Sequence, residues 1–195
     1  MKIGVLALQG DFQEHEEILK KLGIDVVEVR LPEHLEGLDG LILPGGESTT
    51  FGKLAEAYGL IEPLRRVASS MPMWGTCAGL IFLSRDVGTP QPILGVLDIV
   101  VARNAFGRQV DSFETELDIR GIEGGAFHGV FIRAPVVKEV GPGVEVLCRL
   151  DDGRIVAVRS GRLMATAFHP ELTDDARLHQ YFLRMVAESD ARSKK

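Results

Sequence analysis

The sequence has little of what marks disulfide-stabilised, membrane-spanning or nucleic-acid-binding proteins. Its two cysteines, Cys77 and Cys148, cannot build a disulfide framework, and neither belongs to a Cys-x-x-Cys pair. No apolar run approaches the roughly 18–20 residues that cross a bilayer. The short apolar run at 2–8 is followed by Gln9-Gly10-Asp11 rather than by a signal-peptide cleavage site. Acidic residues outnumber basic ones by 28 to 22, the opposite of the balance in a nucleic-acid-binding domain. We therefore expect a cytoplasmic protein that binds neither membranes nor nucleic acid.

Repeats, low-complexity tracts and linkers are also missing, so nothing divides the chain. With 195 residues, 45% of them hydrophobic and 26% charged, it has the length and composition of one globular domain, 1–195. Disordered chains combine low hydrophobicity with a large charge imbalance, and this sequence has neither. Only the polar end, from about residue 189, is expected to fray.

The first third of the sequence alternates apolar runs with segments of helical periodicity. Strands are predicted at 2–8, 25–30, 40–43 and 72–74, and helices from residue 12, at 48–69 with a break near Gly59, and at 78–83. Asp11 and Glu14 resemble a capping box at the start of the first helix, which places His15 and Leu19 on one side. This alternation predicts a parallel sheet with right-handed crossovers.

The middle of the sequence consists of short strand-like runs that glycine, proline and aspartate separate. They lie at 95–101, 112–118, 127–132, 144–150 and 154–159, and Asp152-Gly153 is a typical two-residue hairpin turn. One more strand, at 163–168, precedes a last helix that begins near Thr173. The predicted fold is a three-layer α/β/α domain with a mostly parallel, flavodoxin-like sheet and a small antiparallel excursion.

The strongest local motif is Gly75-Thr76-Cys77-Ala78-Gly79, between a predicted strand and a predicted helix. Glycines on both sides of a nucleophile allow the sharp turn of a nucleophile elbow. The helix N-terminus then favours the thiolate form of Cys77, and the N–H of Ala78 faces an oxyanion. An isolated cysteine is more often a buried structural residue, and we interpret Cys148 in this way. The flanking glycines favour the catalytic interpretation for Cys77.

A base for such a nucleophile is present in Phe168-His169-Pro170-Glu171, which follows the strand at 163–168. Pro170 favours an extended conformation at His169, and in an extended segment the side chain of Glu171 points the same way as that of His169. The segment lies at the carboxyl end of the sheet, where α/β proteins bind ligands. The alternative is an ordinary strand-to-helix turn, and the presence of Cys77 decides for catalysis.

The loop Leu43-Pro44-Gly45-Gly46-Glu47-Ser48-Thr49-Thr50 also joins a strand to a helix. Its paired glycines expose backbone N–H groups that suit an oxyanion hole. A phosphate-binding loop is excluded because the lysine-serine/threonine ending is missing and Glu47 repels phosphate. A plain turn with a helix cap remains the alternative. Gly4 and Gly10 make no dinucleotide fingerprint, and no cluster has metal-ligand spacing, so we expect no metal.

Two arginines, Arg103 and Arg133, each close an apolar run. A planar guanidinium suits the carboxylate of a substrate. Most arginines are simply solvated, however, and spacing alone does not distinguish these two from the others.

Together the motifs resemble those of triad-type glutamine amidotransferases. Six segments, distributed over nearly the whole chain, are similar more narrowly to the glutaminase subunits of the pyridoxal 5′-phosphate synthase that works without deoxyxylulose phosphate: 4–10, 43–50, 75–80, 103–109, 129–135 and 168–172. The resemblance implies that Cys77 is the nucleophile, His169 the general acid and base, and Glu171 the residue that orients His169. It implies an oxyanion hole and a glutamine pocket as well: Gly46 and Ala78 for the former, and Gly46, Glu47, Ser48, Arg103, Ile132 and Arg133 for the latter.

The resemblance also implies an activity. Members hydrolyse L-glutamine to glutamate and ammonia through a cysteinyl thioester, without a cofactor. They pass the ammonia to a separate synthase subunit in a hetero-oligomer that makes vitamin B6, and they are nearly inactive until that partner docks. The residues themselves leave three alternatives open: the glutaminase subunit of another amidotransferase, a stand-alone cysteine hydrolase or redox sensor of the same fold, and a binding module in which Cys77 is core.

Overall fold

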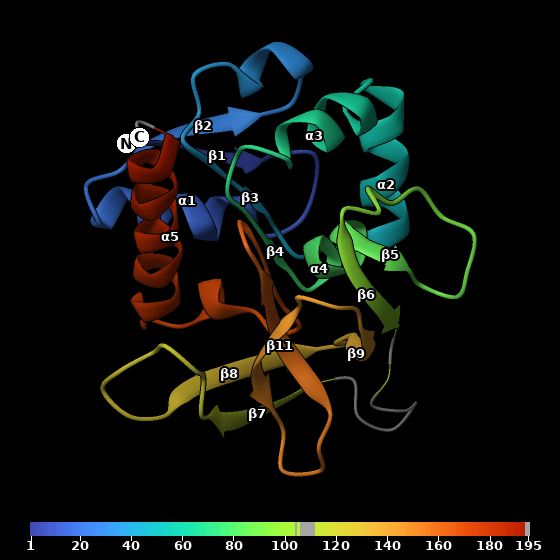
Figure 1. Cartoon of the computed structure of the whole chain (residues 1–195), viewed down its shortest axis with the longest axis vertical. Coiled ribbons are helices and arrows are strands. Elements are labelled where there is room, and N and C mark those ends of the chain that lie inside the picture. Colours follow the sequence, from blue (N-terminus) through green and yellow to red (C-terminus); the bar gives the residue numbers. More distant parts are fainter. Residues whose placement is uncertain (104, 106–111, 194–195) are drawn as a thin grey trace.

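A mixed ten-stranded sheet forms the centre of the molecule in the computed structural model, which describes residues 1–103, 105 and 112–193. Five parallel strands make up one half of it, in the order β2 (Asp25–Val29), β1 (Lys2–Leu6), β3 (Gly40–Leu43), β4 (Met73–Thr76) and β12 (Leu163–Thr166) (Figure 1). β3, β4 and β12 are buried along their whole length, as strands covered on both faces are. The order, with the first strand between the second and the third, is that of a flavodoxin-like sheet, which confirms the predicted fold class.

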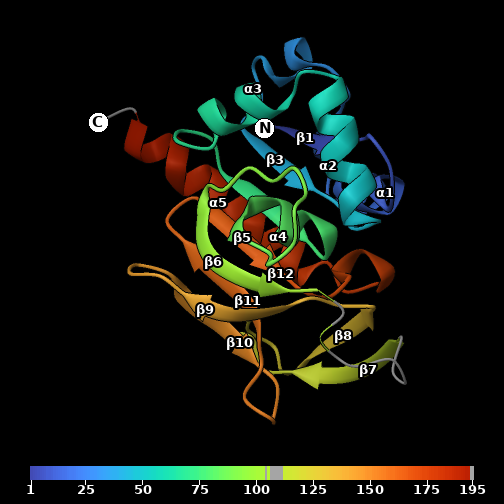
Figure 2. The ribbon, with the colours of Figure 1, turned by 90° about the vertical axis from the view of Figure 1, so that its right-hand side faces the viewer.

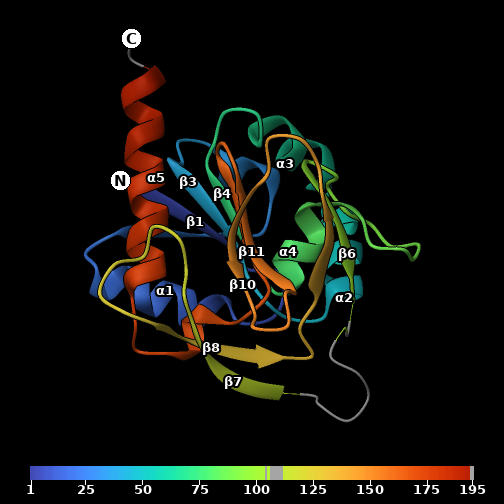
Figure 3. The ribbon, with the colours of Figure 1, turned by 60° about the horizontal axis from the view of Figure 1, so that its bottom comes forward.

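Helices cover both faces of this parallel half (Figure 3). α1 (Phe12–Lys21) and α5 (Arg177–Ser193) lie on one face, and α2 (Ser48–Ala57), α3 (Ile61–Val67) and α4 (Ala78–Leu83) lie on the other. A 3-10 helix, η1 (Pro32–Leu35), connects β2 to β3. The predicted helical break near Gly59 is confirmed, because that residue has a φ of +67° between α2 and α3.

Most of the predicted middle strands extend the main sheet rather than standing apart from it. β11 (Ile155–Ser160) pairs antiparallel with β12, and β9 (Val136–Val140), β6 (Leu97–Ala102) and β5 (Ser84–Asp86) follow in turn. β10 (Glu145–Arg149) forms the predicted hairpin with β11. The sequence does not predict β5 and β9: β5 has only three residues, and β9 has no regular alternation of buried and exposed side chains.

β7 (Ser112–Leu117) and β8 (Phe127–Ile132) form a separate antiparallel pair below the main sheet (Figure 2). Aromatic packing joins this pair to the end of β12. Phe113 stacks on Phe131 with ring centroids 4.5 Å apart, and Phe131 packs on Phe168 at 5.4 Å. The N–H of His169 donates to the carbonyl of Val130 at 2.8 Å. The small sheet is therefore fixed beside the predicted catalytic histidine.

The end of the chain differs from the sequence prediction. A 3-10 helix, η2 (Pro170–Leu172), follows β12, so the last helix begins at Arg177 rather than near Thr173. α5 extends to Ser193, and Arg162 Nε donates to Ser189 Oγ at 2.8 Å. The fraying expected from about residue 189 stays a prediction. Residues 194–195 lie outside the described part of the chain. Among the described residues, no helix has both the length and the hydrophobicity that a bilayer span requires.

Candidate active site

The turn between β4 and α4 holds Cys77 in a backbone conformation that few residues adopt, with φ +46° and ψ −100°. Two glycines make room for it. A Cβ on Gly79 would lie 1.9 Å from the carbonyl oxygen of Leu43, and a Cβ on Gly75 would lie 2.5 Å from the backbone of Gly79. Strained backbone at a residue between a strand and a helix is the geometry of a nucleophile elbow, which is the geometry that the sequence predicts.

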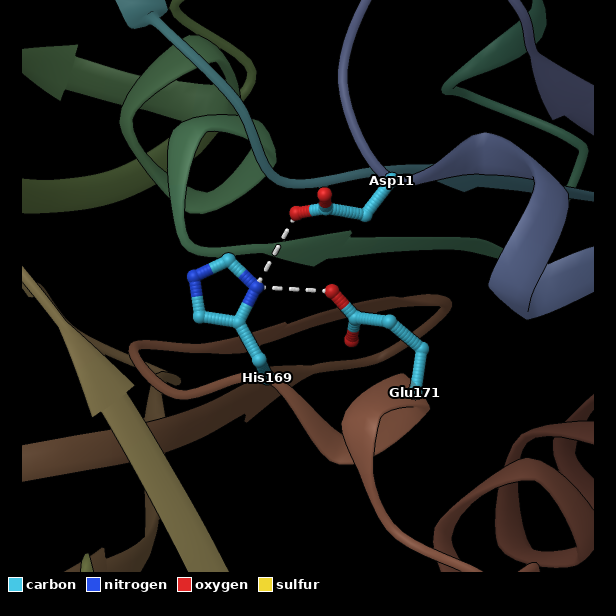
Figure 4. Close-up of side chains that lie close together, drawn as sticks. All are labelled: Asp11, His169 and Glu171. Carbon is cyan, nitrogen blue, oxygen red and sulfur yellow. Dashed lines mark hydrogen bonds and ion pairs between the residues drawn. The ribbon is translucent and has the colours of Figure 1, made fainter.

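Two carboxylates converge on one ring nitrogen of His169 (Figure 4). Glu171 Oε1 lies 2.7 Å from Nδ1, and Asp11 Oδ2 lies 3.2 Å from the same atom. The sequence predicts that Glu171 reaches His169 along an extended segment, but residues 170–172 form the 3-10 turn η2 and His169 has a ψ of 84°. The turn of η2, rather than strand alternation, therefore brings the carboxylate to the ring.

Asp11 does not cap α1, contrary to the sequence prediction. Its side chain makes no capping hydrogen bond, and its backbone N–H donates to the carbonyl of Gly45 at 3.3 Å. The carboxylate turns toward His169 instead. Sequence reasoning missed this role because an aspartate before a helix is the usual sign of a cap.

The pairing of His169 with acidic groups changes its acidity. Burial by itself lowers the pKa of His169, but hydrogen bonds with Asp11, Cys77 and Glu171 outweigh it and raise the pKa to about 12. Burial raises the pKa of Glu171, and its hydrogen bond to His169 acts in the opposite direction. The arrangement therefore favours an imidazolium at His169 that faces the sulfur of Cys77 on one side and carboxylates on the other.

Asp11, His169 and Glu171 place one potential metal-ligand atom each within 4.8 Å of one another. Both carboxylates, however, contact the same ring nitrogen, Nδ1. A protonated Nδ1 is a hydrogen-bond donor and cannot coordinate a metal. We therefore interpret the group as a hydrogen-bonded one.

A cavity of about 410 Å³ opens next to Cys77 and His169. Its volume is in the range of small-molecule sites. Eight of the residues predicted from the sequence line it: Cys77, His169, Gly46, Glu47, Ser48, Arg103, Ile132 and Arg133. Asp11, Ile81 and Leu172 complete the lining.

The glycine loop after β3 is held against the loop after β1. Gly46 has a φ of +143°, and a Cβ there would lie 2.3 Å from the side chain of Gln9. That side chain binds the backbone of Glu47 twice: Gln9 Oε1 accepts from the N–H at 3.2 Å, and Nε2 donates to the carbonyl at 3.4 Å. Gln9 thus fixes the loop through a contact between residues 38 positions apart, which no local sequence pattern predicts.

Glu47 and Arg103 place opposite charges in the cavity wall, 3.4 Å apart. Hydrogen bonds from Thr50, first of all from its hydroxyl, and from Thr49 lower the pKa of Glu47 to about 2, so its carboxylate is charged at neutral pH. Arg103 also donates to Thr49 Oγ1 at 3.1 Å and to Gln91 Oε1 at 2.8 Å. The contacts distinguish Arg103 from an ordinary solvated arginine.

The end of β8 and the residue after it supply another part of the wall. The carbonyl of Ile132 lies 4.0 Å from Cys77 Sγ, and Arg133 has a φ of +44°. Within the described chain, Cys77 and Arg133 are the two non-glycine residues with positive φ, and both line the cavity. Strain of this kind gathers at functional sites because surrounding structure must sustain it.

The other predicted site residues lie close by. Glu171 is buried behind His169, and Ala78 is the buried first residue of α4, next to Cys77. Of the predicted motif at 103–109, residues 104 and 106–109 lie outside the described residues.

Comparison with known proteins agrees with this geometry. A model of the SNO glutamine amidotransferase family matches residues 5–188. The chain belongs to that family. The resemblance predicted from the sequence motifs is thereby confirmed.

Individual members of this glutamine amidotransferase family match over nearly their full length. A protein of Herpetosiphon aurantiacus is 57% identical over 94% of this chain and 99% of its own, and one of Thermus thermophilus is 59% identical over 94% and 97%. Both are described as pyridoxal 5′-phosphate synthase subunit PdxT.

Two solved structures are also similar to this chain. A crystal structure of a glutamine amidotransferase has a TM-score of 0.90 at 59% identity and covers 95% of this chain and 98% of its own. A Thermoplasma acidophilum protein described as a putative GMP synthase component has a TM-score of 0.74 at 17% identity, over 100% and 98% of the two chains. The second similarity is one of fold alone.

Proposed function

We propose that this chain is the glutaminase subunit of a pyridoxal 5′-phosphate synthase and hydrolyses L-glutamine at Cys77. The observation that carries the proposal is that the strained elbow of Cys77 and the carboxylate-backed ring of His169 open into one cavity. Family membership and the names of the near-full-length relatives support the substrate and the pathway.

The reaction begins with attack of the Cys77 thiolate on the carboxamide carbon of glutamine, which forms a tetrahedral oxyanion. The N–H groups of Gly46 and Ala78 stabilise that oxyanion. The imidazolium of His169 gives its Nε2 proton to the departing ammonia, and a thioester on Cys77 remains. Water then attacks the thioester with His169 as base, which releases glutamate and restores the thiolate–imidazolium pair.

The charges of the cavity wall match the amino-acid end of glutamine. The ionised carboxylate of Glu47 attracts the α-ammonium group, and the guanidinium groups of Arg103 and Arg133 attract the α-carboxylate. Ser48 and the backbone of Ile132 border the same space. Opposite charges on one wall favour a zwitterion over a simple amide.

The ammonia serves a second protein. The relatives are named as one subunit of a synthase, which supports a hetero-oligomer in which a separate synthase subunit receives the ammonia. A glutaminase subunit of another amidotransferase would have the same cysteine chemistry. These two kinds of glutaminase subunit are distinguished by the synthase subunit that increases their release of ammonia. The two free cysteines fit a cytoplasmic location.

The test is ammonia release from glutamine, measured with and without a purified pyridoxal 5′-phosphate synthase subunit. We expect release that rises when the synthase subunit is present and disappears in Cys77→Ala, while Cys148→Ala, the matched change at the other cysteine, keeps it. Wild-type release from Cys77→Ala, or alkylation of Cys77 no faster than that of Cys148, would contradict the proposal and favour a binding module.

A further inference from the structure

A group of buried polar side chains lies behind Glu171, on the side away from His169. Glu171 Oε2 lies 3.4 Å from His15 Nε2 and has no conventional hydrogen bond among the residues that the structure describes. His15 Nε2 also lies 3.2 Å from Thr76 Oγ1, and His15 Nδ1 lies 2.9 Å from His179 Nε2. Both histidines are fully buried. Neither belongs to the cavity wall.

Burial favours the neutral form of both histidines. Burial lowers the pKa of His179 to about 3, and burial, first of all, together with repulsion from the nearby His169 lowers the pKa of His15 well below its usual value. Each ring therefore carries one proton, and one of the two donates to the other across the 2.9 Å contact.

The surroundings decide which ring donates. If His15 donated from Nδ1, its bare Nε2 would face the carboxylate of Glu171, and His179 would carry a proton on Nδ1, which has no hydrogen-bond partner in the described chain. A buried N–H without an acceptor is costly. If His179 donates from Nε2, its Nδ1 is a bare acceptor and His15 carries its proton on Nε2. That assignment leaves no N–H unpaired and points the His15 N–H at Thr76 and Glu171.

We propose that His15 is a positioning residue for the glutaminase reaction: its Nε2–H holds Oε2 of Glu171, so that the carboxylate stays ionised and its Oε1 stays directed at His169. This rests on the proposed function of Cys77, His169 and Glu171. His179 acts one step further away, by keeping the proton of His15 on Nε2. The groups that face Glu171 are then His169 and Asp11 in front and His15 behind, with Thr76 and His179 facing His15.

The two histidines provide a matched pair of variants. His15→Phe removes the ring-nitrogen contacts with His179, Thr76 and Glu171, whereas His179→Phe removes only the contact with His15. We expect His15→Phe to lower kcat by about 10-fold to 100-fold, the range that follows from loss of catalytic alignment, with KM nearly unchanged. His179→Phe should lower kcat by less than about 3-fold, and His15→Gln, whose amide N–H takes the place of Nε2–H, should recover most of the activity.

The pH profile separates positioning from loss of stability. Without the His15 dipole, the buried carboxyl of Glu171 protonates more readily, so the acid limb of kcat moves to higher pH in His15→Phe. A merely structural role would lower the amplitude and leave the limb in place. The double variant His15→Phe/His179→Phe removes both hydrogen-bond partners, so it provides the measurement if the single variant does not fold.

Alkylation of Cys77 by iodoacetamide gives a second readout that needs neither glutamine nor the partner. Cys148 serves as an internal control, because burial raises the pKa of its thiol to about 11. We expect clearly slower alkylation of Cys77 in His15→Phe and a much smaller decrease in His179→Phe. Equal losses in the two variants, an unshifted acid limb, or wild-type kcat and alkylation in His15→Phe would each overturn the proposal. Failure of wild-type protein to release ammonia would instead overturn the proposed function.

Discussion

Replacing Glu171 or Asp11 tests how His169 is held, because both carboxylates face the same N–H. Glu171 is the stronger partner: its contact is 2.7 Å and its side chain is wholly buried, whereas that of Asp11 is 3.2 Å long with 34% of the side chain exposed. A hydrogen bond to a charged group contributes about 1.5–3 kcal/mol, or about 10-fold to 150-fold in rate. Since Asp11 remains in Glu171→Gln, we expect the lower end, about 10-fold, and about 3-fold or less for the more solvated contact of Asp11→Asn.

The double variant Asp11→Asn/Glu171→Gln should lose far more than the product of the two single losses. With neither carboxylate present, the Nδ1–H of His169 has no anionic acceptor, and the loss approaches the roughly 10⁴-fold seen when a triad carboxylate is neutralised. We therefore expect about 10³-fold. His169→Ala should lose more than Glu171→Gln, because it removes the proton carrier rather than its support.

The assay is kcat for ammonia release at saturating glutamine with the synthase subunit present, for the four members of the cycle. Glu17→Gln, the same change of charge at an exposed position of α1, is the control and should be neutral. If the losses of the two single variants simply multiply in the double variant, the idea that Asp11 and Glu171 share one N–H of His169 is refuted.

Three further predictions concern the elbow, the substrate wall and the last helix. Gly79→Ala should abolish ammonia release and lower the melting temperature in a thermal scan, because its Cβ would lie 1.9 Å from a backbone carbonyl oxygen. Hydrogen bonds from Thr50 lower the pKa of Glu47 to about 2, so the KM for glutamine should stay flat between about pH 5 and pH 8, and Glu47→Gln should raise KM about 10-fold in steady-state kinetics. Arg177→Leu removes hydrogen bonds to three backbone carbonyls of the 123–126 loop and should lower the free energy of unfolding by about 1–3 kcal/mol in urea titration.

The elbow and the glycine loop are predictable from sequence because each is a local backbone problem. A strand that turns sharply into a helix needs small residues beside the turn, and Gly75 and Gly79 meet that need here. The alternation of apolar runs and helical periodicity locates the turn. The positions of Cys77 and Gly46 at strand ends follow from the same alternation. Arg103 differs: its contact with Glu47 joins residues 56 positions apart, and nothing local marks it.

The remaining part of the site could not be predicted because it depends on long-range contacts. Asp11 reads locally as a helix cap, and only the position of η2 beside α1 turns its carboxylate to His169. The contact between His15 and His179 spans 164 residues, so periodicity predicts a buried face for His15 but not what it meets there. The same limit applies to the sheet: hairpin signals predict β10 and β11, but no local pattern shows that β11 lies between β12 and β9.

Register explains why segments so far apart in sequence meet at one cavity. In the parallel half, Leu43 pairs with Gly75, and Thr76 pairs with Thr166. β3, β4 and β12 therefore end at nearly the same level, and the loops after them begin side by side at the carboxyl edge of the sheet. The residue after β4 is Cys77, and the loop after β12 carries His169. A one-residue slip of β12 would turn each of its side chains to the opposite face. The meeting of nucleophile and base is thus a property of strand register, which the fully buried strands fix by packing on both faces.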